Sequence, residues 1–115
     1  MVRLSVRLHA RRWQARAIVD ALRMLMRGTR LEPGCLGCQA WTSAEEEESG
    51  LSEVHYEERW ASESAIENRV RSDAFTKLLE VLEAAADLPS VEFDFVSRHQ
   101  GLEYVEDIRR GSDST

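Results

Sequence analysis

The chain has 115 residues, of which 43% are hydrophobic and 31% charged, and its formal net charge is −6. This length fits one domain with a single, thin core. The acidic balance argues against binding to a nucleic-acid backbone, because proteins that do so present a basic face. The sequence has no apolar run near the roughly 18 residues of a membrane helix and no signal-peptide pattern, so we expect a cytoplasmic protein.

The N-terminal segment alternates between apolar and polar residues, which predicts a half-buried strand over residues 2–10. From Trp13 onwards the period becomes that of a helix, with an apolar stripe that reaches Met26. Gly28 follows the stripe as a predicted helix end. The apolar positions of the first segment are Val2, Leu4, Val6, Leu8 and Ala10.

Two more strands are predicted around a polar loop. Pro33–Gly34 marks a turn, and residues 36–42 form a short second strand. The glutamate run in residues 43–50 is interpreted as a solvated hairpin tip. Residues 51–60 form the third strand, with two sets of side chains on opposite sides. Val54, Tyr56, Glu58 and Trp60 share one side, whereas Glu53, His55, Glu57 and Arg59 share the other.

The next segment predicts a helix that begins after Ser62, an N-cap residue, and restarts near Ser72–Asp73. Its apolar stripe begins at Phe75, and Pro89 ends it. Residues 91–95 alternate as a fourth strand.

The C-terminal residues give weaker signals. Residues 102–108 are expected to add a short fifth strand, and residues 110–115 to form a disordered tail. We therefore expect one domain over residues 1–109.

The order β-α-β-β-α-β predicts an α+β, ferredoxin-like fold: a four-stranded antiparallel sheet with both helices on one face. The other face carries Arg3 and Arg7 on the first strand, between acids such as Glu57, Glu92 and Asp94 on its neighbours. Opposite charges on adjacent strands stabilise a sheet by roughly 0.2–1 kcal/mol per pair. We expect a second copy of the chain to cover this face; a monomer with a wet, charged face is the alternative.

The cysteines and histidines give little indication of metal or redox chemistry. Cys35-x-x-Cys38 leads into a strand, where an odd separation points the two side chains to opposite faces. Reactive C-x-x-C motifs instead begin a helix, which lowers the thiol pKa. The histidines, His9, His55 and His99, form no compact ligand set in the sequence. We therefore expect no metal site.

Several segments together resemble the antibiotic biosynthesis monooxygenase family of dimeric α/β barrels. They are Glu32-Pro33-Gly34-Cys35-Leu36-Gly37, Glu58-x-Trp60, Ser62-x-x-Ala65-Ile66 and Ser72-x-x-Phe75, and the likeness extends from the first strand to about Phe95. The resemblance implies a ferredoxin-like homodimer, in which two sheets face each other as a barrel. It also implies either cofactor-free oxygenation of phenols and quinols or degradation of heme.

One position departs from the family pattern. The family commonly has a histidine about nine residues after the tryptophan, and the heme-degrading relatives use it as the iron ligand; here the residue is Arg69. Arginine stays protonated and cannot ligate iron as a neutral nitrogen donor. We therefore expect no heme. Arg69 either binds an anionic group of a substrate or is solvated on the helix surface.

The resemblance implies that Trp60 lines a pocket, although a core aromatic at the same corner explains it equally well. Glu58, if it faces the core, must be paired or protonated. It is then either a general base or a salt-bridge partner. His55 is the other candidate base, and Arg7 the other candidate anion partner.

Trp41 and Tyr56 complete the expected substrate contacts, because three tryptophans in a small domain suggest a cavity for a flat ligand, or simply packing. The expected function is that of a cofactor-independent monooxygenase, an oxidoreductase acting on a small aromatic phenol or quinol without metal or flavin. The alternative is a non-catalytic dimeric barrel that binds a small hydrophobic ligand.

Overall fold

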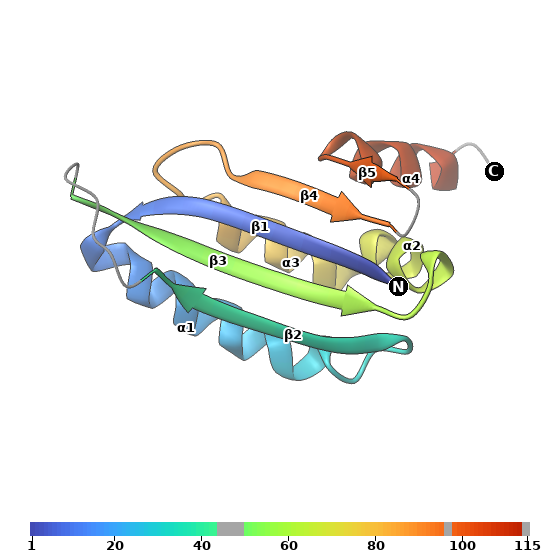
Figure 1. The fold of residues 1–115 in the computed structure, drawn as a ribbon, viewed down its shortest axis with the longest axis horizontal. Helices are drawn as coiled ribbons and strands as arrows, with labels where there is room; N and C mark the ends of the chain where they lie inside the picture. The colour runs from blue at the N-terminus through green and yellow to red at the C-terminus, as the bar shows by residue number, and fades with distance from the viewer. Residues whose placement is uncertain (44–49, 96–97, 114–115) are drawn as a thin grey trace.

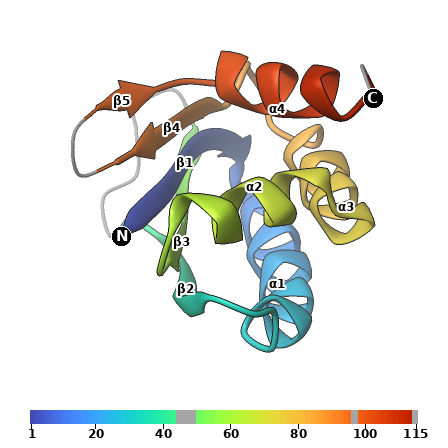
Figure 2. The ribbon, with the colours of Figure 1, turned by 90° about the vertical axis from the view of Figure 1, so that its right-hand side faces the viewer.

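The computed structural model describes residues 1–43, 50–95 and 98–113. One antiparallel sheet has the strand order β2-β3-β1-β4-β5. The strands are β1 (Val2–Arg11), β2 (Cys35–Thr42), β3 (Leu51–Trp60), β4 (Ser90–Asp94) and β5 (His99–Gln100). The helices are α1 (Arg12–Thr29), α2 (Glu63–Arg71), α3 (Asp73–Leu82) and α4 (Glu103–Asp113). They cover one face of the sheet and leave the other, called here the open face, without a helix layer (Figures 1 and 2).

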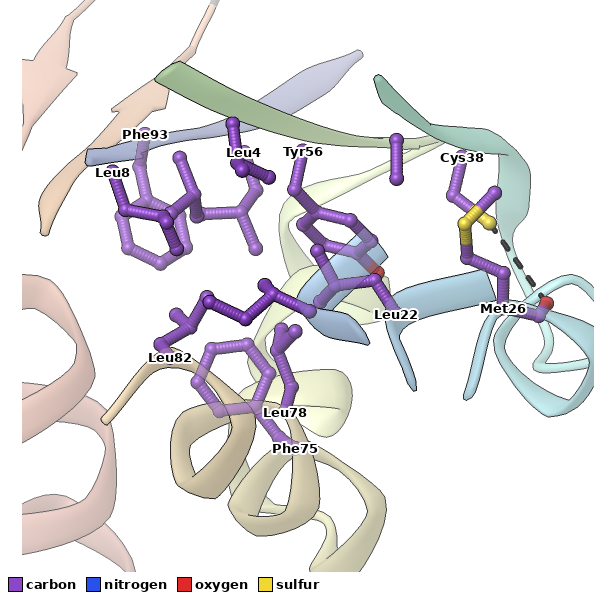
Figure 3. Packing of buried hydrophobic residues seen from close by; sticks show 14 of the residues in the cluster. Leu4, Leu8, Leu22, Met26, Cys38, Tyr56, Phe75, Leu78, Leu82 and Phe93 are labelled. Carbon is purple, nitrogen blue, oxygen red and sulfur yellow. Dashed lines mark hydrogen bonds between the residues drawn. The ribbon is translucent and has the colours of Figure 1, made fainter. Parts of the chain in front are cut away.

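The core lies between the sheet and the helices, as the alternation in β1 predicts. The apolar side chains of β1 are all nearly inaccessible to solvent and meet α1 and α3. Figure 3 shows Leu4 and Leu8 of β1 facing Leu22 of α1 and Phe75 of α3. Since buried apolar area contributes roughly 25 cal/mol per Å², this layer is the main source of stability. The predicted ferredoxin-like arrangement is confirmed.

Serine side chains set the helix boundaries that the sequence predicts. Ser62 Oγ accepts a hydrogen bond from the backbone N–H of Ala65 at 3.2 Å and begins α2. Ser72 Oγ accepts one from Phe75 N at 3.2 Å and donates one to the Arg69 carbonyl at 2.6 Å. A single hydroxyl therefore ends α2 and begins α3.

The C-terminal predictions need correction. Residues 102–108 do not form a strand: they contribute to α4, while the fifth strand is the short β5, so the sheet has five strands and not four. Tyr104 of α4 packs against Phe93 and Phe95, with ring centroids 4.9 and 5.2 Å apart. The buried pair Tyr104–Val105 followed by the half-buried Ile108 has the helical spacing that the prediction overlooked.

The predicted tail begins too early. Helix α4 continues through Asp113, so residues 110–113 are helical and not disordered. Residues 114–115 and most of the glutamate loop, residues 44–49, lie outside the described residues.

The prediction for the two cysteines is also wrong. A β-bulge shifts the β2–β3 register, so that Cys35 lies opposite Trp60 and Gly37 opposite Arg59. The extra residue puts Cys35 and Cys38 on the same face of the sheet, toward the helices. Burial raises the pKa of both thiols, that of Cys38 to about 11. Cys38 Sγ lies 3.9 Å from the Met26 carbonyl oxygen (Figure 3).

None of the helices in the described part of the chain is both long and apolar enough to cross a bilayer.

Candidate functional site

The sheet divides the predicted site residues into two groups. Tyr56, Glu58 and Trp60 alternate along β3 and point toward the helices, where they meet Arg69 of α2. The remaining three predicted residues, Arg7, Trp41 and His55, line a hollow on the opposite, open face. Because successive strand residues point to opposite faces, β3 contributes to both groups.

The first group is a buried charge cluster centred on Glu58, which is fully inaccessible to solvent. Its Oε1 accepts hydrogen bonds from Trp60 Nε1 at 2.9 Å and Arg69 Nε at 3.1 Å. Its Oε2 accepts them from Tyr56 Oη at 2.5 Å and Arg69 Nη2 at 2.8 Å. Arg69 Nη1 also donates to Glu32 Oε2 at 2.8 Å, so one guanidinium holds two carboxylates.

The protonation states follow from these contacts. Burial alone would lower the pKa of Arg69, but the hydrogen bonds and negative charge of Glu58 raise it above its ordinary value. Burial and the charge of Glu58 raise the pKa of Tyr56, so its phenol stays neutral and donates. Burial also raises the pKa of Glu32, and the nearby Arg69 only partly offsets this.

The contacts of the cluster show where each of its members lies and what it binds. Glu58 is a salt-bridge partner, with all its hydrogen bonds made inside the protein. Arg69 does not lie on the helix surface, since its side chain is 1% exposed, and the anions it holds are Glu58 and Glu32. Trp60 is a core aromatic and is 1% exposed. A guanidinium so engaged also offers no ligand to a heme iron.

The hollow on the open face has a volume of about 250 Å³, at or just below the lower end of the size range of small-molecule sites. The rings of Trp41 and His55 stack at its wall, with centroids 5.2 Å apart and planes 7° from parallel. Arg7 adds a cation that has no ion-pair partner within the described residues. The carboxylates of Glu57 and Glu92 complete its charged lining.

His55 is held at one ring nitrogen. Its Nε2 lies 2.9 Å from Glu53 Oε1 and 3.0 Å from Ser43 Oγ. The alternation of the third strand predicts Glu53 on the open face, and its spacing of two residues from His55 on that strand was a usable signal of their contact. Ser43 was missed because its approach to His55 depends on the β2–β3 pairing.

A second group of polar side chains was not expected. Glu92, Asp94 and His99 offer ligand atoms that all lie within 4.8 Å of one another, because β5 pairs His99 with Asp94. A hydrogen bond from His99 Nδ1 to Asp94 Oδ1, 2.8 Å long, raises the pKa of this histidine. Contrary to the expectation from the sequence, one histidine therefore does belong to a compact group of possible ligand atoms. Exposed groups of this kind are common without an ion, so we assign no metal here.

Known proteins share this fold. The chain is similar to the solved structure of a candidate antibiotic biosynthesis monooxygenase from Deinococcus radiodurans, with a TM-score of 0.66 and 20% identity over 85% of this chain and 94% of that one. A candidate member from Nitrosomonas europaea gives 0.66 and 16%, over 83% and 97% of the two chains. The protein PA3566 from Pseudomonas aeruginosa gives 0.63 and 22%, over 82% and 91%. At these identities the likeness establishes the fold alone.

No curated protein matches the chain. The sequence profile of the antibiotic biosynthesis monooxygenase family, in contrast, matches residues 1–81, which include β1 to β3 and the whole charge cluster. The chain therefore belongs to the antibiotic biosynthesis monooxygenase family.

Proposed function

We propose that the protein is a cofactor-independent monooxygenase that oxidises a small aromatic phenol or quinol in the hollow on the open face. The observation that carries this proposal is the hollow itself, where the stacked Trp41–His55 pair adjoins the Arg7 guanidinium. An aromatic wall suits a flat ring, and a cation suits the oxygen of a phenolate. Family membership supports the reaction class.

Each residue of the hollow has a part in the proposed reaction. His55 accepts the phenolic proton, and Arg7 stabilises the resulting phenolate. This electron-rich anion transfers an electron to O₂, so the proposal requires neither metal nor flavin. For a substrate with a reactive methylene, one O₂ converts CH₂ to C=O and releases one water. Glu58 takes no part, because its oxygens are bound inside the core.

We further propose that the protein works as a homodimer whose open faces oppose each other. A hollow in an exposed face leaves a bound anion in water, whereas a second sheet would exclude that water and strengthen the contact with Arg7. The expected mass in light scattering is about 26 kDa, twice the 13.1 kDa of the chain.

The free cysteines, Cys35 and Cys38, are compatible with the reducing cytoplasm.

The test is oxygen consumption with a panel of hydroquinones and anthrones. We expect turnover by the wild type and a loss of about 10²-fold or more in kcat for His55→Ala, the magnitude typical of a lost general base. Arg7→Gln should mainly raise KM. The matched control is His99→Ala, an exposed histidine outside the hollow, which should leave kcat unchanged. Equal effects of the two histidine substitutions would contradict the proposal.

A second candidate is a dimeric barrel that binds a small hydrophobic ligand without turnover. It is favoured by the commitment of Glu58 to Arg69, which removes one of the two bases expected from the sequence. Quenching of Trp41 fluorescence by a phenol, together with no oxygen uptake, would support this function over the first.

A further inference from the structure

A row of alternating imidazole and carboxylate groups leads away from the hollow across the open face. His55 Nε2 lies 2.9 Å from Glu53 Oε1, and the other oxygen of that carboxylate, Oε2, lies 3.4 Å from His9 Nε2. His9 Nδ1 in turn lies 3.1 Å from Asp87 Oδ2. One carboxylate thus bridges two histidines, and a second carboxylate ends the row.

The fold assembles this row from simple rules. Glu53 and His55 are two residues apart on β3, so they share a face. His9 of β1 lies directly opposite Glu53 in the strand register. The backbone N–H of Ala86 donates to the His9 carbonyl at 2.7 Å, which ties the α3–β4 connection to the end of β1 and brings Asp87 beside the ring.

The row determines which nitrogen of His55 carries the proton. The negative charge of the Glu53 carboxylate, 2.9 Å away, favours a proton over a lone pair on His55 Nε2, and this N–H then donates to Ser43 Oγ at 3.0 Å. In the neutral ring the lone pair then resides on Nδ1. Within the described residues Nδ1 has no hydrogen-bond partner, because the contacts with Glu53 and Ser43 are both at Nε2.

His9 is the second histidine beside the Glu53 carboxylate. Its two ring nitrogens face carboxylate oxygens: Nε2 lies 3.4 Å from Glu53 Oε2, and Nδ1 makes a hydrogen bond of 3.1 Å with Asp87 Oδ2. These contacts restrict where the Glu53 side chain lies and keep its other oxygen beside His55.

From these contacts we infer that Glu53 is a positioning residue for His55. It fixes the Nε2–H tautomer, leaves Nδ1 as the basic atom for a ligand in the hollow, and stabilises the imidazolium that forms when the proton moves from the ligand oxygen to Nδ1. His9 and Asp87 hold Glu53 in turn. The catalytic role of Glu53 rests on the proposed function, whereas its effect on the tautomer of His55 does not.

Nitrogen-15 NMR of the histidine rings in the full chain, without ligand, tests the inference directly. We expect His55 in the Nε2–H form in the wild type. We expect a shift toward the Nδ1–H form or a mixture in Glu53→Gln, whose amide can donate as well as accept. The control is Asp94→Asn, which changes a carboxylate of the same face that contacts His99 instead. An unchanged tautomer in Glu53→Gln, or an Nδ1–H ring in the wild type, would overturn the inference.

Kinetics supply the second measurement. Glu53→Gln should lower kcat by about 10–100-fold, the usual effect of losing the partner that orients a functional imidazole, with little change in KM. Asp87→Asn should act in the same direction and less strongly. If no phenol or quinol is turned over by the wild type, the proposed function fails, yet a Glu53-dependent tautomer would still uphold the positioning role. A tautomer that is indifferent to Glu53, with turnover intact, would reject the positioning role alone.

Discussion

Glu58 and His55 lie three residues apart on one strand, and their surroundings give them different tasks. Glu58 is enclosed by donors, whereas His55 borders the hollow and has one ring nitrogen unengaged within the described residues. The alternation of β3 was sufficient to predict which face each residue occupies. A salt bridge was one of the two alternatives for Glu58, but Arg69 was not predicted as its partner, because this pairing depends on where α2 lies over the sheet and no local pattern records that.

The buried cluster predicts a large effect of Arg69→Met. This substitution leaves the Glu58 carboxylate buried without its cation, and breaking such a pair costs about 3–5 kcal/mol. Urea unfolding should show this loss. The double variant Glu58→Leu/Arg69→Met removes both charges and should be more stable than the single variant. A loss under about 1 kcal/mol for Arg69→Met would contradict the central place of this pair.

Glu32 gives a pH dependence of defined sign. Its pKa is raised in the folded state, chiefly by burial, so the folded protein binds this proton more tightly than the unfolded chain does. The stabilisation from Glu32 is therefore complete below the unfolded pKa and is lost as the pH rises through the folded pKa. Glu32→Gln should gain stability relative to the wild type as the pH rises from about 4 toward neutrality. Urea unfolding at several pH values measures the difference, and a constant difference would refute the expectation.

The thiols should react slowly. The pKa of Cys38 is raised from 9.0 to about 11, chiefly by burial, so the thiolate at neutral pH is roughly 100-fold scarcer than for an ordinary cysteine. Modification by maleimide in the native protein should lag well behind that in urea. Fast reaction of both thiols in the native state would instead revive a redox role for Cys35-x-x-Cys38.

At the scale of elements, β2 is an edge strand whose carbonyls are partly covered. Arg23 Nη2 lies 3.4 Å from the Ala40 carbonyl oxygen, and Arg30 Nη2 lies 3.3 Å from that of Cys38. Both side chains come from α1 or the residue after it. Charged side chains at an edge hinder pairing with another sheet.

The double variant Arg23→Ala/Arg30→Ala should therefore aggregate more readily, as measured by light scattering during incubation at high concentration. The control, Arg16→Ala/Arg27→Ala, changes the net charge equally but alters exposed arginines of α1 that make no hydrogen bond to a β2 carbonyl. If the two variants aggregate equally, the cause is the change in net charge and not the loss of the side chains that cover the β2 carbonyls.

The elements themselves were predictable to different degrees. Strong alternation predicted β1 and β3, and the serine caps predicted the start of α2 and the break between α2 and α3. The predicted end at Pro89 was wrong, because α3 ends at Leu82. Helix α4 was mistaken for a strand, because its buried residues are few and its burial depends on Phe93 from β4. The bulge near Cys35 could not be foreseen, since a change of register arises from the pairing of two strands.

At the scale of the molecule, the open face is the surface through which we propose that two copies associate. The register places Ser5 at its centre, between Glu57 of β3 and Glu92 of β4. If two copies associate through this face, Ser5→Trp should separate them and give a mass near the 13.1 kDa of one chain in light scattering. The control is Met24→Arg on the outer side of α1, a residue 74% exposed, which should remain dimeric. A dimer that survives Ser5→Trp would use another face.

The bend at Ser72 sends the two halves of the helical segment to different neighbours. Helix α3 contacts α1, whereas α2 contacts α4. Arg109 of α4 donates to the carbonyl of Val70, the residue next to Arg69, at 2.9 Å. Arg109 also donates to Thr76 Oγ1 of α3 at 3.2 Å, so a disturbance at the C-terminus, such as a fused tag or a deletion, would reach both α3 and the charged interior next to α2.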